Sequence, residues 1–129
     1  MATFKNIFLI DDDDLFIFLT KTIIEDEKFA DHIHSYEDAR EAMEYLKSSD
    51  EKPFPEIIFL DINMPMMDGW EFIDALEKSK IKHDIIIYIT SSSINPLDLK
   101  KAESNPSIKG FISKPLDPAK LKKIAEGRL

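Results

Sequence analysis

Four short apolar runs in this chain each lead directly into a polar or charged residue. The runs are 4–10, followed by Asp11 and Asp12; 57–60, followed by Asp61; 85–89, followed by Thr90; and 110–113, followed by Lys114. In open α/β sheets, ligands bind at the edge formed by the carboxyl ends of the parallel strands. If the four runs are strands of one such sheet, three carboxylates, a hydroxyl and an ammonium group meet at that edge.

Segments with helical periodicity and helix-start residues separate these runs. Asp13 and Asp14 can cap a helix after the first run, and Ser35 followed by Asp38 resembles a capping box for a second helix. The first of these helices is expected to present one apolar face, made by residues at helical spacing: Leu15, Phe18, Leu19, Thr22 and Ile23.

The second half of the chain repeats the pattern with clearer helix starts. Asp68 or Gly69 opens a third helix, and Asn95-Pro96 and Asp117-Pro118 each read as an N-cap with Pro at the first helical position. A short, weak strand is expected at 32–35. The sequence therefore predicts an α/β fold of five βα units in a single domain, 1–129, with the parallel sheet covered by helices on both faces.

Composition narrows the possible functions. The 129 residues carry 25 acidic and 17 basic side chains, a net charge of −8, which argues against binding to nucleic acid through its phosphates. The absence of cysteine excludes thiol chemistry. No apolar stretch approaches the roughly 20 residues of a membrane helix, and the N-terminus lacks a signal-peptide pattern, so we expect a cytoplasmic protein without membrane contact.

The residues at the strand ends suit phosphate chemistry. Asp11, Asp12 and Asp61 supply the oxygen ligands that Mg²⁺ prefers, and a cation would relieve the repulsion between them. Lys114 offers a charge suited to a phosphate oxygen, and Thr90 offers a neutral donor. A carboxylate can also act as a nucleophile and form an acyl phosphate.

One segment makes the chain resemble a known family. Asp61-Ile-Asn-Met-Pro-Met-Met-Asp-Gly69 is similar to the phosphoacceptor segment of response-regulator receiver domains, which read Asp-x-x-Met-Pro-x-Met-Asp-Gly. The pairs Asp11-Asp12, Thr90-Ser91 and Lys114-Pro115 also match that family, in order. The resemblance covers about Asn6 to Ile124 and implies a flavodoxin-like, doubly wound five-stranded parallel sheet in the order 2-1-3-4-5.

The resemblance also implies a role for each site residue. Asp61 would accept a phosphoryl group, and Mg²⁺ would be held by Asp12 and Asp61, by the main-chain carbonyl of Asn63, and by Asp11 through water. Lys114 would hold a phosphoryl oxygen and form a cis peptide with Pro115.

A signalling role rather than metabolic catalysis follows from the same resemblance. The phosphoryl donor would be a sensor histidine kinase or a histidine phosphotransfer protein. Thr90 and Phe111 would form the switch, Asn63 and Ser91 would set the rate of self-dephosphorylation, and the last two strands and helices would contact an output protein.

Three alternatives remain open from the sequence. A haloacid-dehalogenase-type phosphohydrolase also uses a strand-end Asp with Mg²⁺, but Asn63 stands where its second acid is needed. A pseudo-receiver scaffold that is never phosphorylated is disfavoured because every site residue is present. A flavodoxin is disfavoured because acids replace the phosphate-binding loop after the first strand.

Overall fold

The computed structural model describes residues 3–48, 53–79, 81 and 84–127. Strands and helices alternate along the chain. Their bounds are β1 (Phe4–Ile10), α1 (Asp14–Asp26), β2 (Ala30–Tyr36), α2 (Ala39–Ser48), β3 (Ile57–Asp61), α3 (Gly69–Lys78), β4 (Ile86–Ser91), α4 (Pro96–Glu103), β5 (Ile108–Ser113) and α5 (Pro118–Ala125). Residues 49–52 of the polar loop between α2 and β3 lie outside the described residues.

All five strands pair in parallel in a single sheet of order β2-β1-β3-β4-β5. The expected flavodoxin-like order 2-1-3-4-5 is thereby confirmed. Because the chain doubles back from β2 past β1 to β3, the carboxyl ends of β1 and β3 lie at the switch point where such sheets bind ligands. The candidate residues are therefore gathered by the topology rather than by closeness in sequence.

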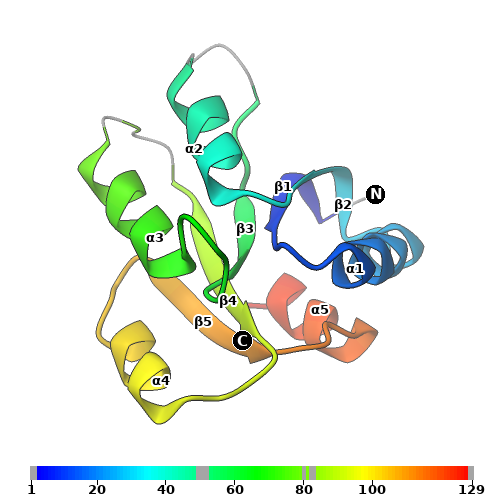
Figure 1. The fold of residues 1–129 in the computed structure, drawn as a ribbon. Helices are drawn as coiled ribbons and strands as arrows, with labels where there is room; N and C mark the ends of the chain where they lie inside the picture. Colours follow the sequence, from blue (N-terminus) through cyan, green and yellow to red (C-terminus); the bar gives the residue numbers. More distant parts are fainter. Residues whose placement is uncertain (1–2, 49–52, 80, 82–83, 128–129) are drawn as a thin grey trace.

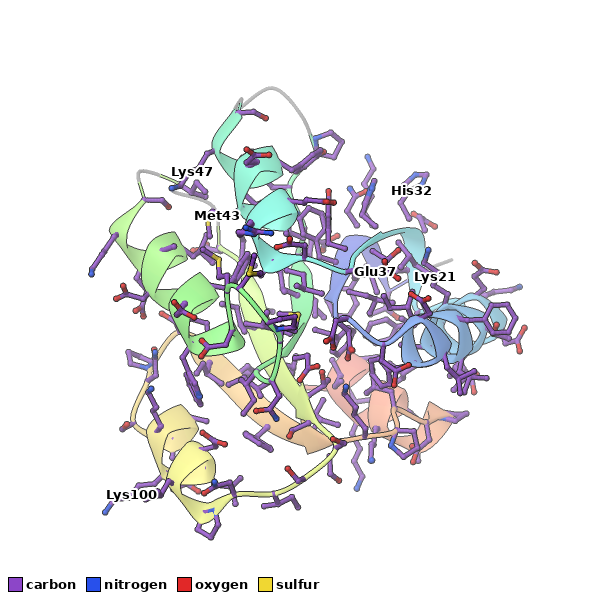
Figure 2. The ribbon with its side chains drawn as sticks, in the orientation of Figure 1. Lys21, His32, Glu37, Met43, Lys47 and Lys100 are labelled. Atoms are coloured by element: carbon purple, nitrogen blue, oxygen red, sulfur yellow. The ribbon has the colours of Figure 1, made fainter. Side chains whose placement is uncertain are left out.

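Helices cover both faces of the sheet, so each face carries its own apolar core. Figure 1 shows α1 and α5 on one side and α2, α3 and α4 on the other. Ile7 and Leu9 of β1 face the first core, and Phe8 and Ile10 face the second. This alternation along a strand buried on both sides explains why β1 and β3 read as unbroken apolar runs. In Figure 2, Met43 of α2 points toward the sheet and Lys100 of α4 points away.

The predicted apolar face of α1 is wrong. The helix buries Phe16, Ile17, Thr20 and Ile24, whereas Leu15, Phe18 and Leu19 are 64, 66 and 49% exposed. Both sets recur at helical spacing, so periodicity could not choose between them. The angle at which α1 leaves β1 decides which face meets the sheet.

The predicted start of α2 is also wrong. Ser35 lies inside β2, which extends from Ala30 to Tyr36 and is longer than the sequence suggested. Asp38 precedes α2, and its carboxylate accepts a hydrogen bond from the Arg40 N–H at 2.9 Å. Strand pairing with β1 therefore prevails over the local capping preference of Ser35.

The other helix starts are confirmed. Asp13, Asp68, Asn95 and Asp117 are the N-caps of α1, α3, α4 and α5, and each side chain accepts hydrogen bonds from main-chain N–H groups of the first turn. In α3, Glu71 completes a capping box with Asp68. None of the described helices combines the length and the apolar character needed to cross a membrane.

Candidate functional site

Three carboxylates meet at the carboxyl ends of β1 and β3. Asp11, Asp12 and Asp61 can each place one oxygen so that all three oxygens lie within 4.8 Å of one another. Asp11 and Asp61 are buried, and Asp12 is exposed at the surface of the cluster. The structure thus brings together the three acids that the sequence singled out.

Short backbone turns fix the two buried carboxylates. Asp11 accepts a hydrogen bond from the Asp13 N–H at 2.9 Å, and Asp61 accepts one from the Asn63 N–H at 3.0 Å. Each acid therefore lies at the carboxyl end of its strand and stabilises the start of the following loop with the same type of turn. The second oxygen of each group contacts Lys114.

Lys114 bridges the two buried acids from the end of β5. Its Nζ lies 2.7 Å from Asp11 Oδ2 and 3.5 Å from Asp61 Oδ2. The contact with Asp11 is the shorter of these two ion pairs. The Lys114-Pro115 peptide is cis, as the resemblance implied.

The protonation of these groups reflects burial and crowding. Burial, with a smaller contribution from the nearby Asp61 charge, raises the pKa of Asp11 from 3.8 to about 6, although Lys114 and the Asp13 N–H partly oppose the shift. Burial lowers the pKa of Lys114, but its contacts with Asp11 and Asp61 outweigh that effect and hold the pKa above its usual value. One lysine therefore does not neutralise the site completely.

This donor set fits a hard divalent cation. Three converging carboxylates with a raised Asp11 pKa are short of positive charge, and Mg²⁺ binds through carboxylate oxygens with its remaining positions free for water and phosphate. Asp11, Asp12 and Asp61 are the residues that could hold it. Asn63 is exposed in the loop, two residues after Asp61.

Thr90 and Ser91 end β4 beside Asp61. Thr90 pairs with Asp61 in the sheet register, and its buried Oγ1 has no hydrogen-bond partner among the described residues. Ser91 is fully buried, and its hydroxyl donates to the Ser93 carbonyl oxygen at 2.7 Å. Thr90 thus has an uncommitted donor, whereas Ser91 stabilises its own loop.

Phe111 lies on β5 at a groove next to α4. The groove has a volume of about 370 Å³, and Leu99, Ala102 and Phe111 contribute to its walls. Phe111 is half-buried and packs against the core on that side of the sheet. It pairs with Ile89, the neighbour of Thr90 on β4.

The sequence did not single out Phe16 as part of the site. Lys114 Nζ lies 4.6 Å from the centre of the Phe16 ring, in a cation–π arrangement. Phe16 belongs to α1 and is buried in the core on that side of the sheet. A contact between α1 and the end of β5 leaves no signal in the local pattern.

Gly69 lies in a closed environment that leaves no room for a side chain. A Cβ at this position would lie 2.7 Å from Ile62 Cα and 2.8 Å from the Asp61 carbonyl oxygen. The start of α3 can approach the end of β3 this closely only because the residue has no side chain. The glycine therefore helps to place the loop that follows Asp61.

The chain is similar to known signalling proteins along nearly its whole length. A two-component response regulator from Cytophaga hutchinsonii has 34% sequence identity and a TM-score of 0.87, with 96% of each chain covered. A two-component response regulator from Legionella pneumophila has 26% identity and a TM-score of 0.81, covering 95% of this chain and 98% of that one. A curated relative, the probable methanogenesis regulatory protein FilR2 of Methanothrix harundinacea, is 26% identical over 122 residues, which are 93% of this chain and 78% of the relative.

The family comparison agrees with the site. The model of the response regulator receiver domain matches residues 7–126, a range that contains every strand-end residue described above. Receiver domains of this family act as signalling switches in two-component systems. The agreement between this match, the sheet order and the acidic cluster shows that the chain belongs to the response regulator receiver domain family.

Proposed function

We propose that this protein is a phosphorylatable receiver that takes a phosphoryl group onto Asp61 and changes conformation in response. The observation that carries the proposal is that Asp61 lies with Asp11 and Asp12 in the carboxylate cluster and contacts Lys114, with the unpartnered Thr90 hydroxyl on the adjacent strand. These groups surround one carboxylate with an anionic cluster for a cation, a fixed ammonium and a free donor. In-line phosphoryl transfer requires little beyond such positioning and charge neutralisation.

The transfer itself is a single displacement. An Asp61 oxygen attacks phosphorus, a P–O bond forms while the P–N bond of the donor phosphohistidine breaks, and the imidazole leaves with the electron pair. Mg²⁺, when bound by Asp11, Asp12, Asp61 and the Asn63 carbonyl, would offset the negative charge of the phosphoryl oxygens. Lys114 is already placed to move from its Asp61 contact to a phosphoryl oxygen.

Thr90 and Phe111 form the proposed switch. A phosphoryl group on Asp61 would offer an acceptor to the Thr90 hydroxyl, which has no partner among the described residues. Movement of Thr90 would alter the packing next to Phe111, whose groove beside α4 leaves space for the ring to turn. An output protein would then contact the face built from β4, α4, β5 and α5.

Water must eventually reach phosphorus to reset the switch. Asn63 is exposed two residues after Asp61, and we propose that its side chain controls the access of water to phosphorus. Ser91 is buried and bonded to Ser93, so we propose that it influences dephosphorylation through the shape of its loop.

An apolar patch supports a protein as the phosphoryl donor. Leu15, Phe18 and Leu19 are exposed at helical spacing on α1, which starts at Asp14, shortly after Asp11 and Asp12. Grouped exposed apolar side chains mark sites of protein interaction. We therefore propose a histidine kinase or phosphotransfer protein as the donor, and a cytoplasmic location in which it is available.

Phosphorylation by acetyl phosphate with Mg²⁺ tests the proposal. Intact-mass measurement should show one added phosphoryl group, and Asp61→Asn should show none, while Asp74→Asn, an exposed change in α3, should match the wild type. Uptake by Asp61→Asn at the wild-type rate would overturn the assignment. Steady turnover of a small phosphate ester would instead indicate a phosphohydrolase.

A further inference from the structure

Lys120 contacts the main chain on both sides of Lys114. Its Nζ donates hydrogen bonds to the carbonyl oxygens of Ser113 and Pro115, each at 2.8 Å. These two residues flank Lys114 in the chain. The Lys114 N–H in turn donates to the Ser91 carbonyl oxygen at 2.8 Å. The backbone at Lys114 is thereby tied to α5 on one side and to β4 on the other.

The helix position that Lys120 occupies does not favour lysine. Lys120 is the third residue of α5, and its N–H is capped by the Asp117 carboxylate at 2.8 Å. At the same position of α3, Glu71 completes a capping box with Asp68. A cation in the first turn is opposed by the helix dipole, and Glu or Gln would complete the same box in α5.

A residue that departs from a local preference often serves a function elsewhere. Lys120 gives up the capping interaction and makes two hydrogen bonds to the loop that carries Lys114. The side chain is half-buried, whereas Lys122 and Lys123 of the same helix are exposed. Its contacts therefore distinguish it from the solvated lysines of α5.

From these contacts we infer that Lys120 is a positioning residue for Lys114 and so for phosphorylation of Asp61. This inference rests on the proposed function. Lys114 Nζ must reach the buried Asp11 and Asp61, and its place depends on the backbone from which the side chain extends. Without Lys120, the Ser113 and Pro115 carbonyls lose a shared donor, and the base of Lys114 is free to shift.

The size of the effect follows from the demands of phosphoryl transfer. A displacement of about 1 Å in a group that contacts the reacting atoms can cost roughly 100-fold in rate. Loss of Lys120 should displace Lys114 by less than that, because the hydrogen bond to Ser91 remains. We expect phosphorylation to slow by about tenfold.

Lys120→Gln is the most informative variant because it separates stability from positioning. Gln can complete the capping box with Asp117, so the free energy of unfolding should not decrease, yet its shorter neutral side chain cannot bridge the two carbonyls. Acetyl phosphate uptake should slow by about tenfold, and Mg²⁺ affinity measured by calorimetry should stay within about twofold, because the carboxylates are unchanged.

Lys120→Arg should restore the wild-type rate to within about threefold, since guanidinium can donate to both oxygens. Lys123→Gln is the matched control and should have no effect.

A double-mutant cycle shows whether Lys120 acts through Lys114. In a Lys114→Met background, Lys120→Gln should cause no further loss of rate, because the side chain that it positions is gone. An equal loss in both backgrounds, or a wild-type rate for Lys120→Gln, would overturn the inference while leaving the proposed function intact. If the wild-type protein takes up no phosphoryl group, the proposed function itself fails.

Discussion

Lys114 Nζ lies closer to Asp11 than to Asp61, at 2.7 Å against 3.5 Å. This lysine therefore lies nearer to the acid that is not the proposed nucleophile. Even so, the pKa of Asp11 is raised to about 6, because burial and the Asp61 charge together exceed the effect of the lysine. The negative charge of the buried carboxylates is therefore not fully compensated, and a bound cation would relieve their repulsion.

The raised pKa of Asp11 predicts a pH-dependent gain in stability for Asp11→Asn. A folded-state pKa of about 6, against 3.8 for the free group, means that the folded protein binds this proton more tightly than the unfolded chain. Ionised Asp11 therefore lowers the free energy of unfolding of the wild type. This cost is absent below pH 3.8, grows as the pH rises, and is complete above about pH 6. Without Mg²⁺, the variant should be more stable at pH 7.5 by up to roughly 3 kcal/mol.

Urea unfolding in the presence of a chelator measures whether Asp11→Asn is more stable than the wild type at pH 7.5. The difference between Asp11→Asn and the wild type should shrink when the measurement is repeated at pH 4. Asp31→Asn, an exposed change on β2, is the control and should show no such trend. A gain in stability for Asp11→Asn that is the same at both pH values would contradict the electrostatic account.

Mg²⁺ should stabilise the wild-type protein and do so less in Asp12→Ala. Binding to the folded state alone adds RT ln(1 + [L]/Kd), which is about 2.7 kcal/mol at 100 times Kd. Removing Asp12 takes away one ligand and one charge from the cluster. The rise in the Tm of Asp12→Ala on addition of Mg²⁺ (the thermal shift) should therefore be clearly smaller than that of the wild type. The thermal shift should also weaken below about pH 6, where Asp11 becomes protonated.

Thermal unfolding with and without Mg²⁺ measures both effects. Asp14→Ala provides a matched control, because Asp14 is an exposed acid at the start of α1 and is not part of the three-carboxylate group. An equal Mg²⁺ shift in Asp12→Ala and the wild type would remove Asp12 from the proposed cation site.

The strand ends were predictable because they depend on a simple rule of topology. Buried parallel strands read as apolar runs, and their carboxyl ends must lie at one edge, so Asp11, Asp61, Thr90 and Lys114 could be placed together from the sequence. The N-caps Asp68, Asn95 and Asp117 were likewise predictable, since each satisfies main-chain N–H groups of its own helix.

Contacts between elements were not predictable in the same way. The buried face of α1 depends on how the helix meets the sheet, and both Phe16 and Phe18 fit a helical stripe. The contacts of Lys114 with Phe16 and of Lys120 with the Ser113 carbonyl join residues whose local patterns carry no sign of them. The start of α2 was missed because pairing of Ser35 with Leu9 of β1 prevails over capping.

The single tryptophan should report on the position of α4. Trp70 Nε1 donates to Asp98 Oδ1 at 3.2 Å, and Lys101 Nζ lies 4.6 Å from the centre of the Trp70 ring, so two residues of α4 contact one residue of α3. Lys101→Met should lower the free energy of unfolding by about 0.5–1 kcal/mol through loss of the cation–π contact. In Trp70→Phe, hydrogen exchange of the α4 amides should become faster.

A second variant separates this contact from general effects of charge. Lys100→Met removes a lysine that points away from the sheet on the same helix (Figure 2), and it should leave Trp70 fluorescence unchanged. Lys101→Met should change it. Identical spectra for Lys101→Met and the wild type would show that Lys101 does not contact the ring in solution.

Gly69→Ala should disturb the phosphoacceptor segment more than Gly110→Ala disturbs β5. The new Cβ at Gly69 would lie within 2.8 Å of the Asp61 carbonyl oxygen and 2.7 Å of Ile62 Cα, both backbone atoms that cannot move separately from Asp61. At Gly110 the nearest atom is Tyr88 Cε1 at 3.1 Å, part of a side chain that can adjust by a few tenths of an ångström. We expect Gly69→Ala to lower the free energy of unfolding by about 1–3 kcal/mol, as overpacking in a well-packed region does, and Gly110→Ala to cost less.

Because the strain falls on the backbone of Asp61, the folded fraction of Gly69→Ala should also take up acetyl phosphate more slowly, whereas folded Gly110→Ala should retain a rate near that of the wild type. Chemical denaturation and phosphorylation at equal folded concentration measure the two effects separately, and a larger loss of either property in Gly110→Ala would contradict the close approach at Gly69.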